Sequence, residues 1–144
     1  MIGAGTVLTV DQVNRVAAAG GTLIVSPNTD TAVIRAAVAA GLVSLPGYYT
    51  MSEAFAALAA GAHGLKLFPA DAAAPSMLKA QRAVLPPTTR VVAVGGIAPD
   101  TMQTWRSVGA DGFGLGSNLY RAGKSPADVA RDAAAYVAAL RNLA

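Results

Sequence analysis

The sequence predicts an α/β fold in which short parallel strands alternate with helices. Short apolar runs recur along the chain, each is followed by an alanine-rich stretch, and the repeat is roughly 20 to 25 residues, the length of one strand and one helix. The six runs are residues 2–7, 22–27, 42–47, 65–70, 91–96 and 112–117. They do not alternate with polar residues, which is typical of parallel strands that helices cover.

The helices between these runs are marked at their ends. A glycine in a left-handed conformation often closes a helix, and glycines stand just before the next apolar run at positions 20, 21, 41, 61 and 109. Ser125 followed by Pro126 predicts the start of the last helix, because serine caps free backbone amides and proline fits the first helical position. Pro99 is expected to have the same role one helix earlier.

The composition of the chain limits the classes of protein to which it can belong. A chain of 144 residues with 53% hydrophobic and 13% charged residues has the make-up of one globular domain. The net charge of +3 comes from basic residues that form no run, so we expect no nucleic-acid partner. The absence of cysteine excludes disulfides and thiolate metal sites. The longest uncharged stretch, residues 36–52, is broken by glycine and proline, so we expect no membrane span and a soluble, cytoplasmic protein.

Six such units can form an open doubly wound sheet or part of a (β/α)8 barrel, and in both the functional groups follow the carboxyl ends of the strands. Two of these ends are rich in glycine: VVAVGGI at 91–97 carries Gly95 and Gly96, and GLGSNL at 114–119 carries Gly116 and Ser117. Glycine lets backbone amides approach a ligand, and a helix that begins there favours an anion. A tight turn explains either motif alone, but two in consecutive units favour a TIM barrel and predict a phosphate site.

Lys66 is the unusual residue of the fourth apolar run, LKLFPA. Side chains alternate along a strand, so Leu65 and Leu67 are expected to face the helices while Lys66 and Phe68 point to the other side. Burial among apolar neighbours favours the neutral amine, which can attack a carbonyl and form a Schiff base. Two other interpretations remain open: the ammonium reaches solvent at the strand end, or an acid distant in sequence neutralises it.

Five segments together resemble a known family. The strings IGAGTV, SPN, LKLFPA, AVGGI and GLGSNLYRAG, in this order and at these separations, resemble the class I 2-keto-3-deoxy-phospho-sugar-acid aldolases, which are built on a (β/α)8 barrel. The match extends over essentially all 144 residues. Gluconate-type members share the GAGTV, FFPA and GGI elements but carry SPG and GGSW where this chain reads SPN at 26–28 and LGSN at 115–118. The galactonate-type members are therefore more similar.

The resemblance implies a reaction and a set of site residues. Lys66 is expected to form a Schiff base with the C2 ketone of 2-dehydro-3-deoxy-6-phosphogalactonate, and cleavage of the C3–C4 bond gives pyruvate and glyceraldehyde 3-phosphate. The substrate-binding residues implied are Thr6, which lines the site, Pro27 and Phe68, which border it, and Gly95, Gly96, Gly116 and Ser117, which hold the phosphate. No metal or organic cofactor is implied. The partners implied are the phosphorylated sugar acid, pyruvate and further copies of the chain, as in the family's trimer.

One element of the family pattern is missing. The family's general base is a glutamate on the second barrel strand, and an arginine on the first strand helps to bind substrate, whereas IGAGTV corresponds to the third strand. We therefore expect residues 1–144 to be a single partial TIM-barrel domain, units three to eight of eight, that is weakly active or inactive by itself. Of the eight acids, only Asp71 follows a strand at the expected end, and an aspartate there is commonly a cap or turn former. The others are expected in helices or at helix starts (Asp11, Asp30, Glu53, Asp100, Asp128, Asp132) or at the opposite end of a strand (Asp111).

Other functions stay open at this point. The sequence is compatible with the gluconate-type and 4-hydroxy-2-oxoglutarate aldolases. A lysine-independent phosphate barrel of the thiamine-phosphate-synthase kind is a second alternative, and Lys66 distinguishes the two classes. A non-catalytic phosphate-binding α/β module is a third; a receiver-like open sheet would need clustered acids at the first and third strand ends, which the sequence lacks.

Overall fold

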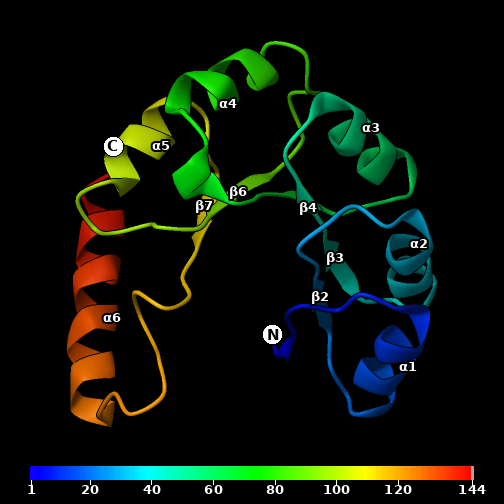
Figure 1. Cartoon of the computed structure of the whole chain (residues 1–144), viewed down its shortest axis with the longest axis horizontal. Coiled ribbons are helices and arrows are strands. Elements are labelled where there is room, and N and C mark those ends of the chain that lie inside the picture. Colours follow the sequence, from blue (N-terminus) through cyan, green and yellow to red (C-terminus); the bar gives the residue numbers. More distant parts are fainter. Residues whose placement is uncertain (144) are drawn as a thin grey trace. The chain divides into compact units, whose positions relative to one another are not determined.

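The computed structural model describes residues 1–143 as an alternation of short strands and helices (Figure 1). The chain divides into two compact units. Unit 1 holds Met1–Phe68 and Pro87–Val91, and unit 2 holds Pro69–Pro86 and the chain from Val92 onward. Within residues 1–143, no helix is both long enough and apolar enough to span a membrane.

The strands of unit 1 are short and parallel. They are β1 (Gly3–Ala4), β2 (Leu23–Val25), β3 (Val43–Leu45), β4 (Gly47–Tyr48) and β5 (Leu65–Leu67). β1, β2 and β3 form one parallel ladder, and β4 pairs in parallel with β5 so that Gly47 lies opposite Lys66. β1, β2, β3 and β5 each lie within one of the first four apolar runs, so those four strand predictions are confirmed, while β4 extends one residue past the run at 42–47.

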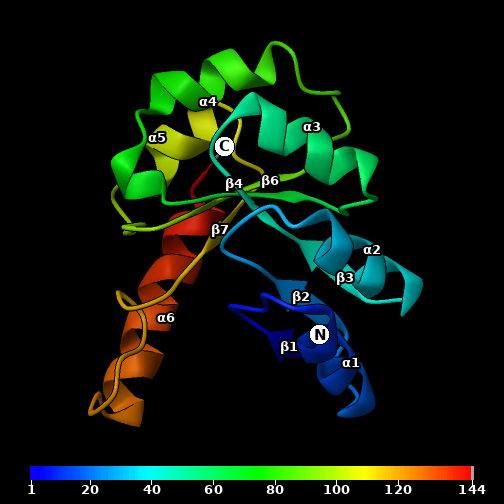
Figure 2. The ribbon, with the colours of Figure 1, turned by 45° about the vertical axis from the view of Figure 1, so that its right-hand side comes forward.

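The helices of unit 1 are α1 (Val10–Ala18), α2 (Thr31–Ala39) and α3 (Met51–Ala59). Each begins after an N-cap residue whose side chain accepts backbone N–H bonds: Thr9, Asp30 and Thr50. Each is followed by a glycine with positive φ, 80° at Gly20, 72° at Gly41 and 95° at Gly61, which confirms the predicted closing glycines. α1 and α2 pack against each other beside the β1–β3 ladder (Figure 2).

A core of apolar side chains holds these helices to the strands. Val13 of α1, Ile24 of β2 and Ala37 of α2 are fully buried in it. Full burial of a valine or isoleucine side chain contributes about 1.5–3 kcal/mol to the stability of the folded chain. The core thereby fixes the strand ends on which the candidate site is built.

The run at 42–47 forms two strands where the sequence predicts one. Pro46 separates β3 from β4, because proline has no N–H to donate to a ladder and interrupts the pairing. The Leu45 carbonyl just before it accepts the N–H of Ser26 at 3.3 Å. The Pro46 carbonyl accepts the N–H of Lys66 at 2.9 Å, which fixes the register between this segment and β5.

Unit 2 contains β7 (Gly112–Gly114) and all of β6 (Val91–Val94) except Val91. These two strands pair in parallel. Its helices are η1 (Ala70–Ala72), α4 (Pro75–Arg82), α5 (Met102–Ser107) and α6 (Pro126–Arg141). The last two strand predictions are confirmed. The start of α6 is also as predicted, because the Ser125 hydroxyl accepts the N–H of Asp128 at 3.1 Å and Pro126 is the first helical residue. Gly109, with φ of 106°, closes α5.

The prediction for Pro99 is wrong. α5 begins at Met102, three residues later. The Thr101 hydroxyl accepts the N–H of Ala98 at 3.0 Å, and the Ala98 carbonyl accepts the N–H of Thr101 at 3.0 Å. Both backbone groups of Ala98 are thus used within a tight turn, and Pro99 lies inside that turn instead of at a helix start.

Candidate active site

Lys66 occupies the middle of β5 and is buried. Its side chain is 9% exposed, and Leu65 and Leu67 on either side of it are fully buried. β5 holds the lysine backbone in place through the bond from its N–H to the Pro46 carbonyl. The burial expected from the apolar run LKLFPA is therefore present in the structure.

The lysine amine faces an aromatic ring. Lys66 Nζ lies 4.0 Å from the centroid of the Phe68 ring, which confirms that these two side chains, two positions apart, point to the same side of the strand. Burial lowers the pKa of Lys66 from its ordinary value because the charged ammonium loses its water. The ring attracts the ammonium and so opposes this effect in part. A larger share of the amine is neutral at a given pH, and only the neutral amine is nucleophilic.

The acids of unit 1 lie at helix starts. Asp30 Oδ1 accepts the N–H groups of Ala32 at 2.8 Å and Val33 at 3.3 Å. Glu53 Oε2 accepts the N–H groups of Tyr49 and Thr50, which lowers the pKa of Glu53. Asp11 lies in the first turn of α1. The helix positions expected for these three acids are confirmed, and among the residues of unit 1 no acid forms an ion pair with Lys66.

Pro27 lies one strand away from Lys66. A Cβ added to Gly47 would collide with the Pro27 carbonyl, so the chain can pass this closely only with glycine at position 47. The Thr29 hydroxyl donates to the Gly47 carbonyl at 2.7 Å, which is a second contact between this segment and Gly47. Because Gly47 is the partner of Lys66 in the β4–β5 ladder, Pro27 and Lys66 are both neighbours of Gly47.

Thr6 lies in the bend after β1 and has φ of 58°, a left-handed conformation that is costly for a β-branched residue. The next residue, Val7, is held to the end of β2 by two hydrogen bonds. Its N–H donates to the Val25 carbonyl at 3.2 Å, and its carbonyl accepts the Ser26 hydroxyl at 2.7 Å. Thr6 lines an open hollow of about 410 Å³ with Gln12 and Arg15, and this hollow does not include Lys66. The structure therefore places Thr6 after the end of β1, beside a hollow that Lys66 does not line.

The two glycines after β6 have conformations that only glycine adopts easily. Gly95 has φ of 115° and Gly96 has φ of 64°. Asp71 of η1 lies against both, since an added Cβ would be 3.0 Å from Asp71 Oδ1 at Gly95 and 2.6 Å from Asp71 Cβ at Gly96. Glycine is thus required here by the turn itself. Asp71, which lies in η1 of unit 2 and not at the start of a loop, places its carboxylate beside the predicted phosphate-binding amides.

Gly116 presents the opposite case. It has no positive φ, and an added Cβ would meet open space. Its carbonyl accepts the N–H groups of Leu119 at 2.9 Å and Tyr120 at 3.0 Å, so the segment forms a short turn with Gly116 and Ser117 exposed at its start. The conformation and packing at position 116 therefore do not require glycine, and its predicted role in binding a phosphate stays a prediction.

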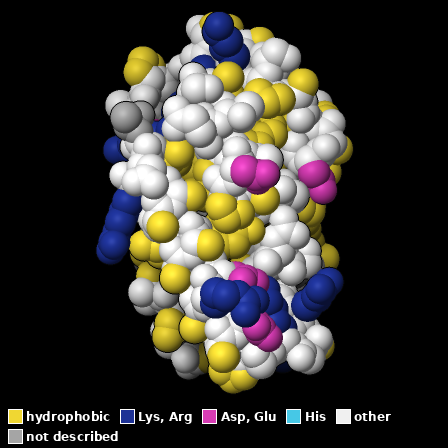
Figure 3. Space-filling view, turned by 90° about the vertical axis from the view of Figure 1, so that its left-hand side faces the viewer, with side chains coloured by type: hydrophobic (Ala, Val, Ile, Leu, Met, Phe, Trp, Pro, Cys, Tyr) yellow, Lys and Arg dark blue, Asp and Glu magenta, His cyan; other side chains and the backbone are white. Residues whose placement is uncertain are grey.

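Basic side chains surround Ser117, a feature that the sequence did not reveal because these residues are spaced along a loop and a helix. Arg121, Lys124 and Arg131 line a hollow of about 620 Å³ together with Ser117 and Asn118. Two acids also line the hollow and pair with the bases. Charged side chains of both signs gather where α6 begins, at the lower end of the face drawn in Figure 3. Within residues 1–143, no group of three or more His, Asp or Glu side chains is placed to hold a metal ion.

Comparison with known proteins gives consistent matches. The family model described as KDPG and KHG aldolase matches residues 1–132. The chain is 51% identical over 139 residues to a probable 2-dehydro-3-deoxy-6-phosphogalactonate aldolase of Rhizobium meliloti (strain 1021). This alignment covers 96% of this chain and 66% of that protein. The chain is also 50% identical over 141 residues to the 2-dehydro-3-deoxy-6-phosphogalactonate aldolase of Escherichia coli (strain K12). That alignment covers 98% of this chain and 69% of the relative.

A solved structure described as native KDPGal matches with a TM-score of 0.97 and 50% identity over 99% of this chain and 69% of the other. The chain thus spans 66% and 69% of the length of the two curated relatives. This structural neighbour has a fold of the TIM-barrel type, and the predicted parallel α/β fold class is confirmed.

Proposed function

Because the chain belongs to the KDPG and KHG aldolase family, we propose that it acts as a class I aldolase, a carbon–carbon lyase, on 2-dehydro-3-deoxy-6-phosphogalactonate. The observation that carries the proposal is Lys66, a buried lysine whose pKa is lowered by desolvation. Two relatives at about half identity are named for the galactonate substrate, which supports this epimer over the gluconate one. The products of the reaction are pyruvate and glyceraldehyde 3-phosphate.

The proposed mechanism begins at Lys66 Nζ. The neutral amine adds to the C2 ketone of the substrate, and loss of water gives a protonated imine. The imine accepts the electron pair of the C3–C4 bond as that bond breaks, while the C4 hydroxyl loses its proton and becomes the aldehyde of glyceraldehyde 3-phosphate. The remaining enamine takes up a proton at C3, and water releases pyruvate and restores the amine.

The other site residues have supporting roles in this proposal. Phe68 places its ring next to the amine and Pro27 borders the same strand ends, while Thr6 lines the substrate site at the end of β1. Gly95, Gly96, Gly116 and Ser117 bind the terminal phosphate, which supplies binding energy away from the reacting carbons. Since the acids of unit 1 lie at helix starts and none forms an ion pair with Lys66, we expect imine formation by this chain to be more efficient than the cleavage that needs a base.

The assembly and compartment follow from the same proposal. We propose that residues 1–144 form one partial barrel domain that associates with further copies of itself, as expected from the family's trimer. A phosphorylated sugar acid carries charges that do not cross a lipid bilayer unaided, so the reaction takes place in the cytoplasm.

Reductive trapping tests the assignment of Lys66. The chain is incubated with pyruvate and borohydride, and the modified residue is identified by peptide mass spectrometry. We expect one reduced pyruvyl group on Lys66, its loss in Lys66→Arg, and its retention in the control Lys79→Arg, which changes an exposed lysine of α4. An unmodified chain, or modification that is equal in the two variants, rules out the Schiff-base mechanism.

The substrate is tested separately by incubating the chain with the galactonate and gluconate epimers and measuring pyruvate. Faster release from the galactonate epimer supports the proposed specificity. Equal release from both epimers, or faster release from the gluconate epimer, contradicts it.

A further inference from the structure

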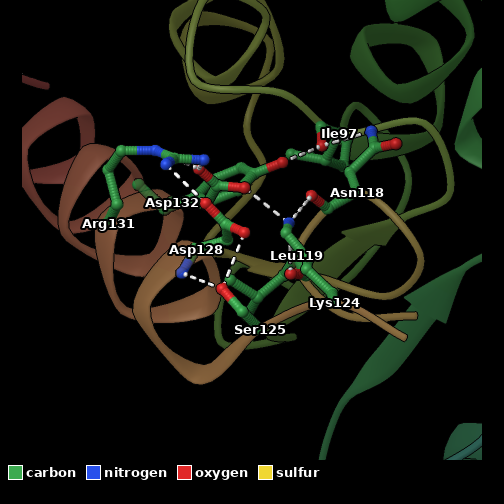
Figure 4. A network of polar contacts seen from close by, with 9 residues as sticks. Ile97, Asn118, Leu119, Lys124, Ser125, Asp128, Arg131 and Asp132 are labelled. Carbon is green, nitrogen blue, oxygen red and sulfur yellow. Dashed lines mark hydrogen bonds and ion pairs between the residues drawn. The ribbon is translucent and has the colours of Figure 1, made fainter. Parts of the chain in front are cut away.

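The carbonyl of Ile97, next to the glycine pair after β6, accepts two side-chain hydrogen bonds. Tyr136 of α6 donates its hydroxyl at 2.8 Å, and Asn118 donates its Nδ2 at 3.0 Å. Figure 4 shows the Asn118 side chain directed at the Ile97 carbonyl. The two donors come from different elements, so this one oxygen joins the Gly96 loop, the Ser117 turn and the last helix.

Tyr136 is buried although its helix is largely exposed. It is 6% exposed and is the one buried residue of α6, whose residues all lie in the described part of the chain. A buried hydroxyl must find an acceptor or lose the free energy of its hydration. The Ile97 carbonyl is that acceptor, which fixes the distance between α6 and the glycine loop.

A second link holds the far side of the Ser117 turn. Lys124 Nζ donates to the Leu119 carbonyl at 2.7 Å and lies 2.5 Å from Asp132 Oδ2 on α6. It also lies 3.4 Å from the Asn118 carbonyl. The turn that begins at Gly116 is therefore attached to α6 through Lys124, and to the Ile97 loop through Asn118.

The two glycine loops are the segment that holds Gly95 and Gly96 and the turn that begins at Gly116. Both need such external support. Gly95, Gly96 and Gly116 restrict the backbone little by themselves, because glycine has many accessible conformations. Amides bind an anion well only when they already point at its position before it arrives. An element that fixes the separation of the two loops therefore acts on the affinity for a phosphate group held between their amides.

We propose that Tyr136 is a positioning residue that, through the Ile97 carbonyl, sets the spacing of the two glycine loops and so the preference for phosphorylated over unphosphorylated ligands. The inference rests on the proposed function only in taking these loops as the phosphate site. Asn118 shares the role, because it donates to the same oxygen.

The test measures phosphate binding directly. The ¹⁵N-labelled 144-residue chain is titrated with inorganic phosphate, and the amide signals of Gly95, Gly96 and Gly116 are followed by NMR. In Tyr136→Phe, which removes only the hydroxyl, we expect the phosphate dissociation constant to rise about fivefold, as for loss of one buried hydrogen bond. The rate of pyruvate trapping at Lys66 is expected to stay unchanged.

A matched variant separates positioning from general destabilisation. Val129→Ala changes a half-buried side chain of the same helix and removes no donor to Ile97. It is expected to lower the melting temperature but leave phosphate affinity as in the original chain. Equal phosphate affinity of Tyr136→Phe and the original chain overturns the inference, and so does an equal loss in Val129→Ala.

Absence of any phosphate response at the three glycines in the original chain also overturns the inference. Pyruvate trapping at Lys66 is measured independently of phosphate binding. The two results therefore distinguish failure of this inference from failure of the proposed Schiff-base chemistry.

Discussion

Lys66 Nζ lies 4.0 Å from the centroid of the Phe68 ring, so the buried ammonium has an aromatic face as its neighbour and no acid as an ion-pair partner among the residues of unit 1. The ring stabilises the charged form, while burial destabilises it and lowers the pKa of Lys66. Burial and the ring thus act in opposite directions on the protonation of this amine.

Replacing Phe68 with leucine tests this balance. Phe68→Leu keeps an apolar side chain but removes the ring, so the pKa of Lys66 is expected to fall further below its ordinary value. The measurement is an NMR titration of ¹³C-labelled lysine, with Lys79 on the exposed face of α4 as the internal control. A pKa of Lys66 that rises in Phe68→Leu contradicts the role given to the ring.

The lowered pKa of Lys66 also predicts how stability depends on pH. Below the folded-state pKa the lysine is charged in both states, and folding bears the full cost of burying the ammonium. Between the folded-state pKa and the unfolded value near 10.5, the unfolded chain binds more protons, so the free energy of unfolding rises with pH. Each unit of pKa difference corresponds to about 1.4 kcal/mol.

Lys66→Met removes this titration while keeping an unbranched side chain. We expect the variant to be more stable than the original chain at neutral pH and to show a smaller rise in stability toward pH 10. Urea unfolding followed at several pH values measures both. A variant that is less stable at neutral pH and keeps the same pH dependence argues against Lys66 as the titrating group.

Much of this arrangement could be predicted from local patterns. Each of the six apolar runs contains a strand, and the closing glycines at positions 20, 41, 61 and 109 have the positive φ that such positions require. The pairing of Lys66 with Phe68 followed from the alternation of side chains on a strand. These features depend on a few neighbouring residues, so the sequence contains them directly.

Features that depend on distant partners could not be predicted in the same way. The turn that displaces the start of α5 past Pro99 arises from the Thr101 hydroxyl, which competes for the backbone of Ala98. The shared carbonyl of Ile97 joins residues that lie 21 and 39 positions away in sequence. Only the folded chain shows that Asn118 and Tyr136 meet there.

The glycines of the two loops are expected to respond differently to substitution. Gly96→Ala places a Cβ 2.6 Å from Asp71 Cβ and forces a φ of 64° on an alanine, so we expect a loss of stability of at least about 1 kcal/mol. Gly116→Ala meets open space and is expected to leave stability nearly unchanged.

If the Gly116 amide region binds phosphate, Gly116→Leu weakens phosphate binding while the chain stays folded, because the side chain occupies the approach of the anion. Thermal unfolding and the phosphate titration separate the two effects. Retained phosphate affinity in a folded Gly116→Leu chain excludes this residue from the phosphate site, and a large loss of stability contradicts the open space seen around it.

Asp71 gives the last prediction, because its carboxylate lies 3.0 Å from the position of a Cβ on Gly95, beside the proposed phosphate-binding amides. A negative charge there opposes an incoming phosphate, so Asp71→Asn is expected to increase phosphate affinity, and the gain is expected to shrink with added salt as the repulsion is screened. The same variant tests whether Asp71 supplies the missing base. If it does, Asp71→Asn lowers the rate of pyruvate release by about 10²- to 10⁴-fold while pyruvate trapping at Lys66 continues. Phosphate affinity that is unchanged or weaker at low salt contradicts the repulsion, and an unchanged rate of pyruvate release excludes Asp71 as the base.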